Sequence, residues 1–181
     1  SNTIERLVQH LKDNTESDIN ISKVIINQIE EQKLSFAQER LWFIEKYEGG
    51  TNAYNIPLVF KLSSEINLDI LETSIKAIVE RHEILRTLIK EDKEGNGYQL
   101  VLDSTKGLLK IEKLVVISKI ELDKELQKSI NHIYDLSNEL PIRICIYYLE
   151  CAKEYYTSIV VHHIAFDGWS AGIFFDELDK Y

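Results

Sequence analysis

The stretch of sequence that decides the fold lies near the C-terminal end of the chain and reads Val161-His162-His163-Ile164-Ala165-Phe166-Asp167-Gly168-Trp169-Ser170. An apolar run at 155–161 precedes the histidines and predicts a buried strand, and the apolar segment at 171–178 predicts a helix. A strand that ends on titratable side chains and turns into a helix is a common way to hold a reactive group at the edge of a rigid sheet. The paired histidines are therefore the first candidates for a site.

A histidine in such a place can also be purely structural, with its imidazole satisfying a buried backbone group. Structural histidines outnumber catalytic ones, so a lone histidine favours that interpretation. Here His162 and His163 form a pair, and Asp167 with its following Gly168 comes four residues after the second of them. The combination favours a functional site.

Composition and charge narrow the function classes. With 181 residues, 44% of them hydrophobic, the chain can bury one good core. The formal net charge is −9, from 30 acidic and 21 basic residues with no block of Lys or Arg. Nucleic-acid and anionic-membrane binding both start from a concentrated basic surface, so both are disfavoured. We also find no signal peptide and no bilayer-spanning apolar stretch, and we expect a soluble cytoplasmic protein.

The two cysteines, Cys145 and Cys151, have neither a metal nor a redox spacing. They read as free thiols of a cytosolic protein. We therefore expect no metal site.

The first part of the chain predicts two short amphipathic helices, at 3–13 and 21–32, joined by a polar loop at 14–20. Each helix has one apolar stripe that must dock on the main core or on a neighbouring part of a longer polypeptide. Residues 1–32 are accordingly a helical linker or a docking-like segment, and residues 33–181 form the main unit.

Ser35 and Gln38 have the spacing of a capping box and predict the start of a helix at 36–47, which Gly49-Gly50 ends. Arg40 stands among large apolar side chains of this helix. It is either paired in the interior or at a cleft, or it extends to solvent along its aliphatic stem.

The remaining residues alternate between extended and helical patterns, with a turn signal at 94–97 that predicts a hairpin. Strands are expected at 54–62, 85–89, 98–102, 108–117, 141–149 and 155–161, and helices from a cap at Asn67 or Asp69 to Arg81, and at 122–133. This order predicts an α/β, or layered α+β, fold in which helices pack on a mixed β-sheet. Arg81 and Arg86 then lie at a helix-to-strand corner.

Three stretches together resemble a known family. Residues 162–168 match the HHxxxDG signature of the condensation domains of nonribosomal peptide synthetases, which is shared with chloramphenicol-acetyltransferase-like acyltransferases. Residues 34–42 resemble the first core motif of condensation domains, 81–87 the second, and 162–170 the third. The resemblance covers about residue 33 to the end. The residues within the motifs are similar to those of the subtype that joins an L-donor to an L-acceptor.

The resemblance implies one lobe of chloramphenicol-acetyltransferase-like fold, the N-terminal lobe of two, with the active site in a tunnel between them. The C-terminal lobe is then missing from residues 1–181, and we expect the isolated chain to be inactive. The resemblance implies no directly bound cofactor, because the substrates arrive on the phosphopantetheine of carrier domains. The implied partners are the donor and acceptor peptidyl carrier domains and adjacent synthetase domains, including the chain's own C-terminal lobe.

The resemblance also implies roles for individual residues. His163 is the catalytic residue, as a general base or as a group that positions the amine, and His162 supports it. Asp167 pairs with an arginine of the second motif, foremost Arg86, and so holds the turn that aims His163; Arg81 is a further supporting residue.

Two smaller roles follow for the residues after Asp167. Gly168 lets the backbone approach the substrate, and Ser170 caps the last helix.

Two other functions stay open at this stage. One is a coenzyme-A-dependent acyltransferase of the same superfamily. The other is a non-catalytic half-domain that binds carrier proteins.

Overall fold

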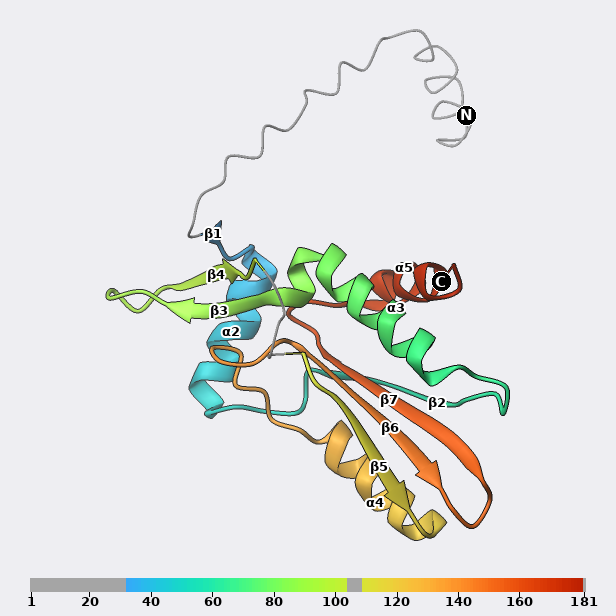
Figure 1. Ribbon diagram of the computed structural model, residues 1–181. Helices are drawn as coiled ribbons and strands as arrows, with labels where there is room; N and C mark the ends of the chain where they lie inside the picture. Colours follow the sequence, from blue (N-terminus) through green and yellow to red (C-terminus); the bar gives the residue numbers. More distant parts are fainter. Residues whose placement is uncertain (1–31, 104–108, 181) are drawn as a thin grey trace, which may run out of the picture.

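The computed structural model describes residues 32–103 and 109–180 (Figure 1). The helix expected at 3–13 and nearly all of that expected at 21–32 lie outside these residues, but Gln32 belongs to a short strand. The elements are β1 (Gln32–Lys33), α2 (Phe36–Glu48), β2 (Asn55–Lys61), α3 (Leu68–Arg81), the 3₁₀ helix η1 (Glu83–Arg86), β3 (Thr87–Glu91), β4 (Gly97–Val101), β5 (Ile111–Val116), α4 (Lys119–Ile130), β6 (Ile142–Leu149), β7 (Glu154–His162) and α5 (Gly168–Leu178).

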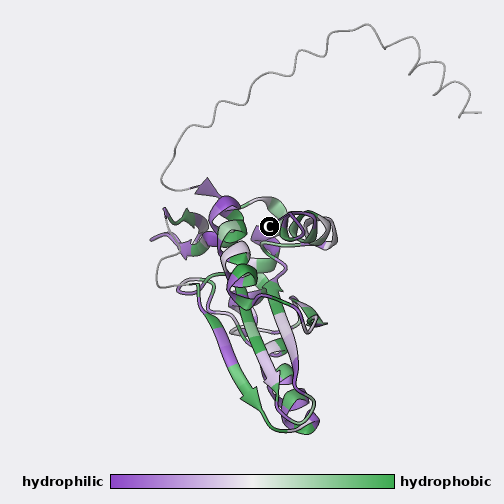
Figure 2. Ribbon diagram, turned by 45° about the vertical axis from the view of Figure 1, so that its right-hand side comes forward, coloured by the Kyte–Doolittle hydropathy of each residue, from purple (hydrophilic) through white to green (hydrophobic). Residues whose placement is uncertain are grey.

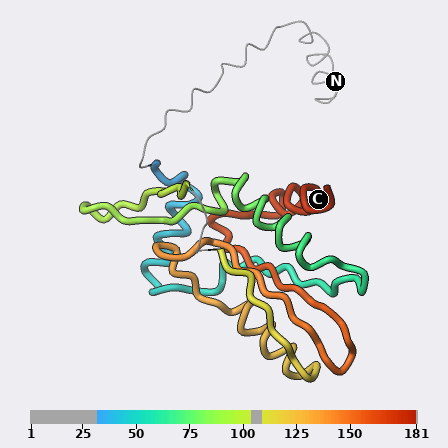
Figure 3. The backbone as a smooth tube through the Cα atoms, in the orientation of Figure 1, coloured from blue at the N-terminus to red at the C-terminus, as the bar shows by residue number. Residues whose placement is uncertain are grey.

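A four-stranded sheet forms the centre, in the order β2-β7-β6-β5. It is the predicted mixed sheet, because β5 runs parallel to β6 while the other neighbours are antiparallel. The backbone trace in Figure 3 shows β2 lying beside β7, although they come from distant parts of the chain. Their register places Asn55 opposite His162. The start of β2 therefore lies at the same end of the sheet as the histidines.

Both faces of this sheet are covered, which explains why most residues of β6 and β7 are buried, the polar Thr157, Ser158 and His162 included. Ile142, Ile144 and Ile146 share a cluster with side chains of α3 and α5. The intervening Cys145 and Tyr147 pack with α4 on the other face. Figure 2 shows the hydrophobic residues gathered along these strands. The period-two alternation of a strand thus divides one apolar segment between two cores.

The predicted hairpin forms, but as part of a second sheet, in the order β1-β4-β3. The strand expected at 85–89 begins only at Thr87. Residues 83–86 form a turn of 3₁₀ helix instead, in which Leu85 N–H donates to the His82 carbonyl at 2.9 Å. This turn lets the chain leave α3 at a sharp angle to enter β3.

Helix α4 begins at Lys119 rather than at 122, because the Ser118 hydroxyl caps it by accepting a hydrogen bond from Glu121 N–H. The helix ends at Ile130, and Ile133, expected on its apolar face, is 56% exposed. The chain then continues as an irregular loop to β6.

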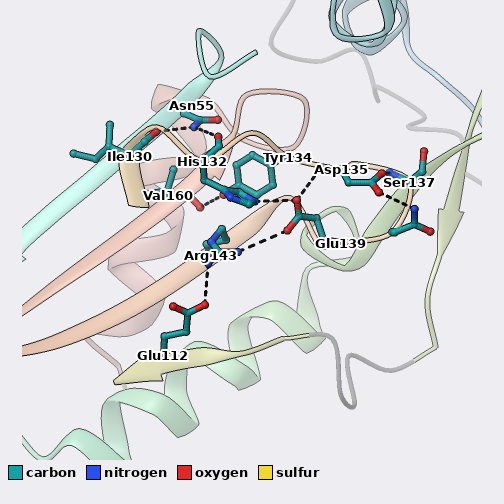
Figure 4. A network of polar contacts seen from close by, with 11 residues as sticks. Asn55, Glu112, Ile130, His132, Tyr134, Asp135, Ser137, Glu139, Arg143 and Val160 are labelled. Carbon is teal, nitrogen blue, oxygen red and sulfur yellow. Dashed lines mark hydrogen bonds and ion pairs between the residues drawn. The ribbon is translucent and has the colours of Figure 1, made fainter. Parts of the chain in front are cut away.

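A polar network holds this loop (Figure 4). The Asn55 amide donates to the carbonyls of Ile130 and His132, at 2.7 and 2.8 Å. His132 Nε2 lies 2.9 Å from Glu139 Oε1, and Arg143 joins the network through an ion pair with Glu139. The network fixes the loop, and with it Tyr134, beside the end of β7 that carries the histidines.

In the described part of the chain, every helix is too short or too polar to cross a lipid bilayer.

Candidate active site

His163 is the first residue after β7 and the second residue of a tight turn. The turn closes through a hydrogen bond from Ala165 N–H to the His162 carbonyl, at 3.0 Å. His163 N–H donates to the Tyr54 carbonyl at 2.8 Å, which ties the turn to the segment before β2. Its side chain is exposed.

The side chain of His163 lines an open groove of about 800 Å³. The groove is formed by α2, the end of β7 and the start of α5, with lining residues Ser35, Ala37, Gln38, Arg40, Leu41, Tyr54, Ile84, Gln99, His163, Ile164, Ala165, Phe166, Asp167 and Ser170. The first and third motifs of the sequence therefore meet in one groove, and Ile84 brings the second motif to its edge.

The hydrogen bonding of His163 decides which of its nitrogens is free. Nδ1 lies 2.7 Å from the Phe166 carbonyl oxygen. A carbonyl can only accept, so Nδ1 must carry the proton. In the neutral ring, Nε2 is then left with its lone pair. The geometry therefore presents an imidazole that can take up a proton at Nε2 and remains anchored at Nδ1.

His162 has the opposite arrangement. It is fully buried, and its Nδ1 accepts a hydrogen bond from Ile164 N–H at 3.1 Å. Nε2 must then carry the proton, which it donates to Glu45 Oε1 at 3.1 Å. Burial lowers the pKa of His162, an effect that outweighs the opposing influence of the Glu45 hydrogen bond. His162 is thus a neutral imidazole bonded on both sides.

Glu45 is a site residue that our sequence reasoning did not find. It lies on α2, is 7% exposed, and accepts a second hydrogen bond, from Thr51 N–H at 3.0 Å. The apolar residues of this helix misled the prediction, because Phe36 and Tyr47 are exposed whereas the carboxylate is inside. The available signal was the spacing of Gln38 and Glu45, which are seven residues apart and share a helix face.

Tyr134 packs against the other side of His162. The two rings meet edge to face, with centroids 5.7 Å apart and planes at 77°. The Tyr134 hydroxyl donates to the Val160 carbonyl at 2.7 Å, and burial raises its pKa. The loop network around Asn55 and Glu139 therefore supports His162 through Tyr134.

The expected ion pair between Asp167 and Arg86 is wrong for this structure. Asp167 is exposed and is the N-cap of α5, where its Oδ1 accepts from both the N–H and the hydroxyl of Ser170, at 2.8 and 2.7 Å. These bonds lower the pKa of Asp167. The expectation that Ser170 caps the helix is also corrected, since Ser170 is the donor in the cap and Asp167 the acceptor.

Replacing Asp167 with alanine should therefore cost only a helix cap. We expect the thermal unfolding temperature to fall by a few degrees, with good yield of folded protein. Differential scanning calorimetry of Asp167→Ala and Asp167→Asn measures this, and asparagine should restore most of the loss because its side-chain oxygen also caps. Insoluble protein from both variants would contradict the cap assignment.

Arg86 binds partners other than Asp167. Its Nε donates to the Glu80 carbonyl at 3.0 Å, one terminal nitrogen donates to the Leu102 carbonyl, and the other pairs with Glu83 at 3.2 Å. The guanidinium thus ties the end of α3 to the end of β4.

Arg81 and the neighbouring His82 both reach Glu177 on α5, at 3.5 and 3.0 Å. Arg81 therefore supports the helix that follows the candidate site rather than the turn itself.

The cluster around Glu177 predicts a pH dependence of stability. The hydrogen bond from His82 holds the pKa of Glu177 below its usual 4.5. A carboxylate with a lowered folded-state pKa adds stability above its unfolded-state pKa and loses it as the pH falls through the folded-state value. Glu177→Gln should therefore unfold at a lower temperature than the parent chain at pH 7.

The two unfolding temperatures should converge as the pH falls from 4.5 into the range below the folded-state pKa of Glu177. Thermal unfolding of both proteins from pH 7 to pH 3 measures this. A difference that persists unchanged at the acidic end would rule out the ionised carboxylate as its source.

Two predicted residues remain, Gly168 and Arg40. Gly168 is the first residue of α5, is exposed, and a Cβ added there would meet no atom within 4 Å. None of the described residues therefore packs against Gly168. Arg40 is exposed and lines the groove, so the interior position is wrong and the alternative in which its side chain extends to solvent agrees with the structure.

Among residues 32–103 and 109–180, no three His, Cys, Asp or Glu side chains come together as metal ligands would.

Comparison with known proteins identifies the family to which this fold and this candidate site belong. The family model described as "Condensation domain" matches residues 28–181. Together with the mixed sheet and the HHxxxDG turn, this match shows that the chain belongs to the condensation-domain family of nonribosomal peptide synthetases.

Two relatives illustrate the similarity in sequence. The chain is 41% identical over 150 residues to N-(5-amino-5-carboxypentanoyl)-L-cysteinyl-D-valine synthase of Amycolatopsis lactamdurans, a match over 83% of the chain and 4% of that protein. It is 36% identical over 137 residues to the dimodular nonribosomal peptide synthase of Bacillus subtilis strain 168, over 76% of the chain and 6% of that protein. The chain thus corresponds to a small part of these relatives.

Two solved structures illustrate the similarity in fold. The X-domain from teicoplanin biosynthesis, in its complex with OxyB, aligns with a TM-score of 0.74 at 25% identity, over 85% of this chain and 33% of that one. The first condensation domain of the calcium-dependent antibiotic synthetase aligns with a TM-score of 0.69 at 15% identity, over 84% and 38%. The predicted fold class, α/β with mixed sheets and covering helices, is confirmed.

Proposed function

We propose that this chain is the N-terminal lobe of a condensation domain that forms a peptide bond between two carrier-bound substrates. The single observation that carries the proposal is the state of His163, an exposed imidazole on a groove with Nδ1 anchored and Nε2 free. The donor is an aminoacyl or peptidyl thioester, the acceptor an aminoacyl thioester, and both arrive on phosphopantetheine.

In the proposed step the acceptor α-amine attacks the thioester carbonyl, a C–N bond forms, and the C–S bond of the donor breaks. His163 Nε2 takes the proton that the amine loses, and the Phe166 carbonyl stabilises the resulting imidazolium through Nδ1–H. The proton then returns to the departing pantetheine sulfur. A role for His163 in orienting the amine alone is the alternative within this proposal.

The wider assignments belong to the same proposal. The partners are the donor and acceptor carrier domains, the adjacent synthetase domains and the chain's own C-terminal lobe, whose wall would close the groove over His163. The open groove supports the expectation that residues 1–181 alone are inactive. The subtype is one that joins an L-donor to an L-acceptor, and the location is the cytoplasm, where the exposed thiol of Cys151 is compatible with reducing conditions.

The proposal is tested by comparing two forms of the donor substrate. The complete synthetase containing this chain is given a donor either on its carrier domain or as the acyl-coenzyme A, with a carrier-bound acceptor in both cases. Intact-mass analysis of the acceptor carrier should show the peptidyl product with the carrier-bound donor and not with the coenzyme A form. Efficient use of acyl-coenzyme A would favour the acyltransferase alternative.

The non-catalytic binding module is kept as a second candidate because of one observation. The X-domain to which this chain is similar was solved in a complex with OxyB. If peptide formation in the complete synthetase were independent of His163, a binding role for this lobe would be the better conclusion.

A further inference from the structure

We infer that Glu45 is a positioning residue for the candidate active site, because it selects the tautomer of His162 that holds the His163 turn. This inference rests on the proposed function and adds to it a residue on a different motif. Glu45 is 118 positions before His163 and touches neither it nor the groove.

The chain of contacts begins at the turn. His162 Nδ1 accepts a hydrogen bond from Ile164 N–H, which belongs to the peptide group that follows His163. The same turn is closed by Ala165 N–H and the His162 carbonyl. The orientation of His163 therefore depends on an acceptor at Nδ1 of its neighbour.

An imidazole offers that acceptor in only one of its two neutral forms. With the proton on Nε2, Nδ1 accepts from Ile164; with the proton on Nδ1, or on both nitrogens, two N–H groups face each other inside the protein. A buried donor without an acceptor is costly, so the turn would shift. Glu45 Oε1, which accepts from Nε2–H at 3.1 Å, selects the form that the turn needs.

Both oxygens of Glu45 are used, which makes a carboxylate specific here. Oε2 accepts from Thr51 N–H at 3.0 Å while Oε1 accepts from His162. A glutamine has one oxygen, so it either leaves the Thr51 amide unpaired or presents its NH₂ group to Nε2. The second arrangement favours the wrong tautomer of His162.

Helix α2 holds the turn at a second point on the same face. Gln38 Nε2 donates to the Ile164 carbonyl at 3.3 Å, and Gln38 Oε1 completes the capping box with Ser35 N–H at 3.0 Å. One helix face thus binds both ends of the segment that carries His163. The buried carboxylate therefore contributes to the aim of a side chain that it does not touch.

The test is a double-mutant cycle in the complete synthetase, with turnover measured at saturating carrier-bound donor and acceptor. Glu45→Gln should lower kcat about tenfold with the KM for both carriers unchanged, on the order of the loss of one charge-assisted hydrogen bond. Glu48→Gln is the matched control, since Glu48 is an exposed glutamate one turn further along α2, and it should have no effect.

The second arm of the cycle is His162→Asn. An asparagine Oδ1 is the same number of bonds from the backbone as Nδ1 and accepts from Ile164 N–H without any choice of tautomer. In this background Glu45→Gln should change kcat less than twofold. Unfolding temperatures measured in parallel show whether every variant is folded at the assay temperature.

Three results would overturn the inference: an unchanged kcat in Glu45→Gln, an equal loss in both backgrounds, or an inactive His162→Asn single variant. If Glu45→Gln does not fold, the His162→Asn single variant decides alone by the same criterion. The parent synthetase reports the proposed function separately, because absence of peptide product from the unmodified enzyme would reject that function.

Discussion

Replacing His163 with alanine in the complete synthetase is expected to lower the rate of peptide formation by about 10²–10⁴, the usual contribution of a general base. The fold should be unaffected, because the side chain is exposed and its hydrogen bond to the Phe166 carbonyl lies within the turn. Single-turnover assays with both carriers loaded, read by intact mass, separate this loss from any defect in loading.

His163→Asn distinguishes a base from a positioning group. The asparagine amide can still donate to the Phe166 carbonyl, but it has no basic nitrogen. If Nε2 removes the proton, asparagine should be as inactive as alanine. Substantial activity of His163→Asn would indicate positioning instead, and full activity of His163→Ala would remove His163 from the mechanism altogether.

Arg86 is expected to give the second large effect, on stability. Arg86→Ala removes donors from the carbonyls of Glu80 and Leu102, and hydrogen bonds from a charged group predict a loss of about 2 kcal/mol in the free energy of unfolding. The Arg86 side chain is only 13% exposed, so water replaces these bonds poorly. Arg86→Lys should recover only part of the loss, because an ammonium lacks the planar fork that reaches separate acceptors.

Denaturant unfolding of Arg86→Ala, Asp167→Ala and the double variant measures this and tests the corrected ion pair. With the contacts described above, the two single effects are unequal and add, because the residues belong to different networks. Equal single losses and a double variant no worse than either would mean that Arg86 and Asp167 pair after all.

Local features of the sequence predicted local structure well. The Ser35–Gln38 capping box, the left-handed Gly49 at the end of α2 and the Asn67 cap of α3 are all confirmed, since each depends on contacts within four residues. The apolar runs at 141–149 and 155–161 correctly predicted the two central strands.

Predictions that depended on distant partners failed where a side chain had several chemically suitable partners. Arg86 and Asp167 have opposite charges, but nearby backbone groups satisfy both, and such competition between neighbours is invisible in a list of residues. The division of the strands into two sheets was likewise not predicted, because hairpin signals specify which strands pair locally and not which sheet they join.

The sequence by itself determined the family, the mixed α/β layer and the pair of histidines, because these depend on periodicity and on a short motif. Tertiary structure alone decided what each histidine can do. The Phe166 carbonyl accepts from His163 and so keeps the proton on Nδ1, whereas Ile164 N–H donates to Nδ1 of His162 and Glu45, from a distant helix, accepts from Nε2, which keeps that proton on Nε2. Adjacent and identical in the sequence, the two imidazoles are opposite tautomers because different backbone and side-chain partners surround them in the fold.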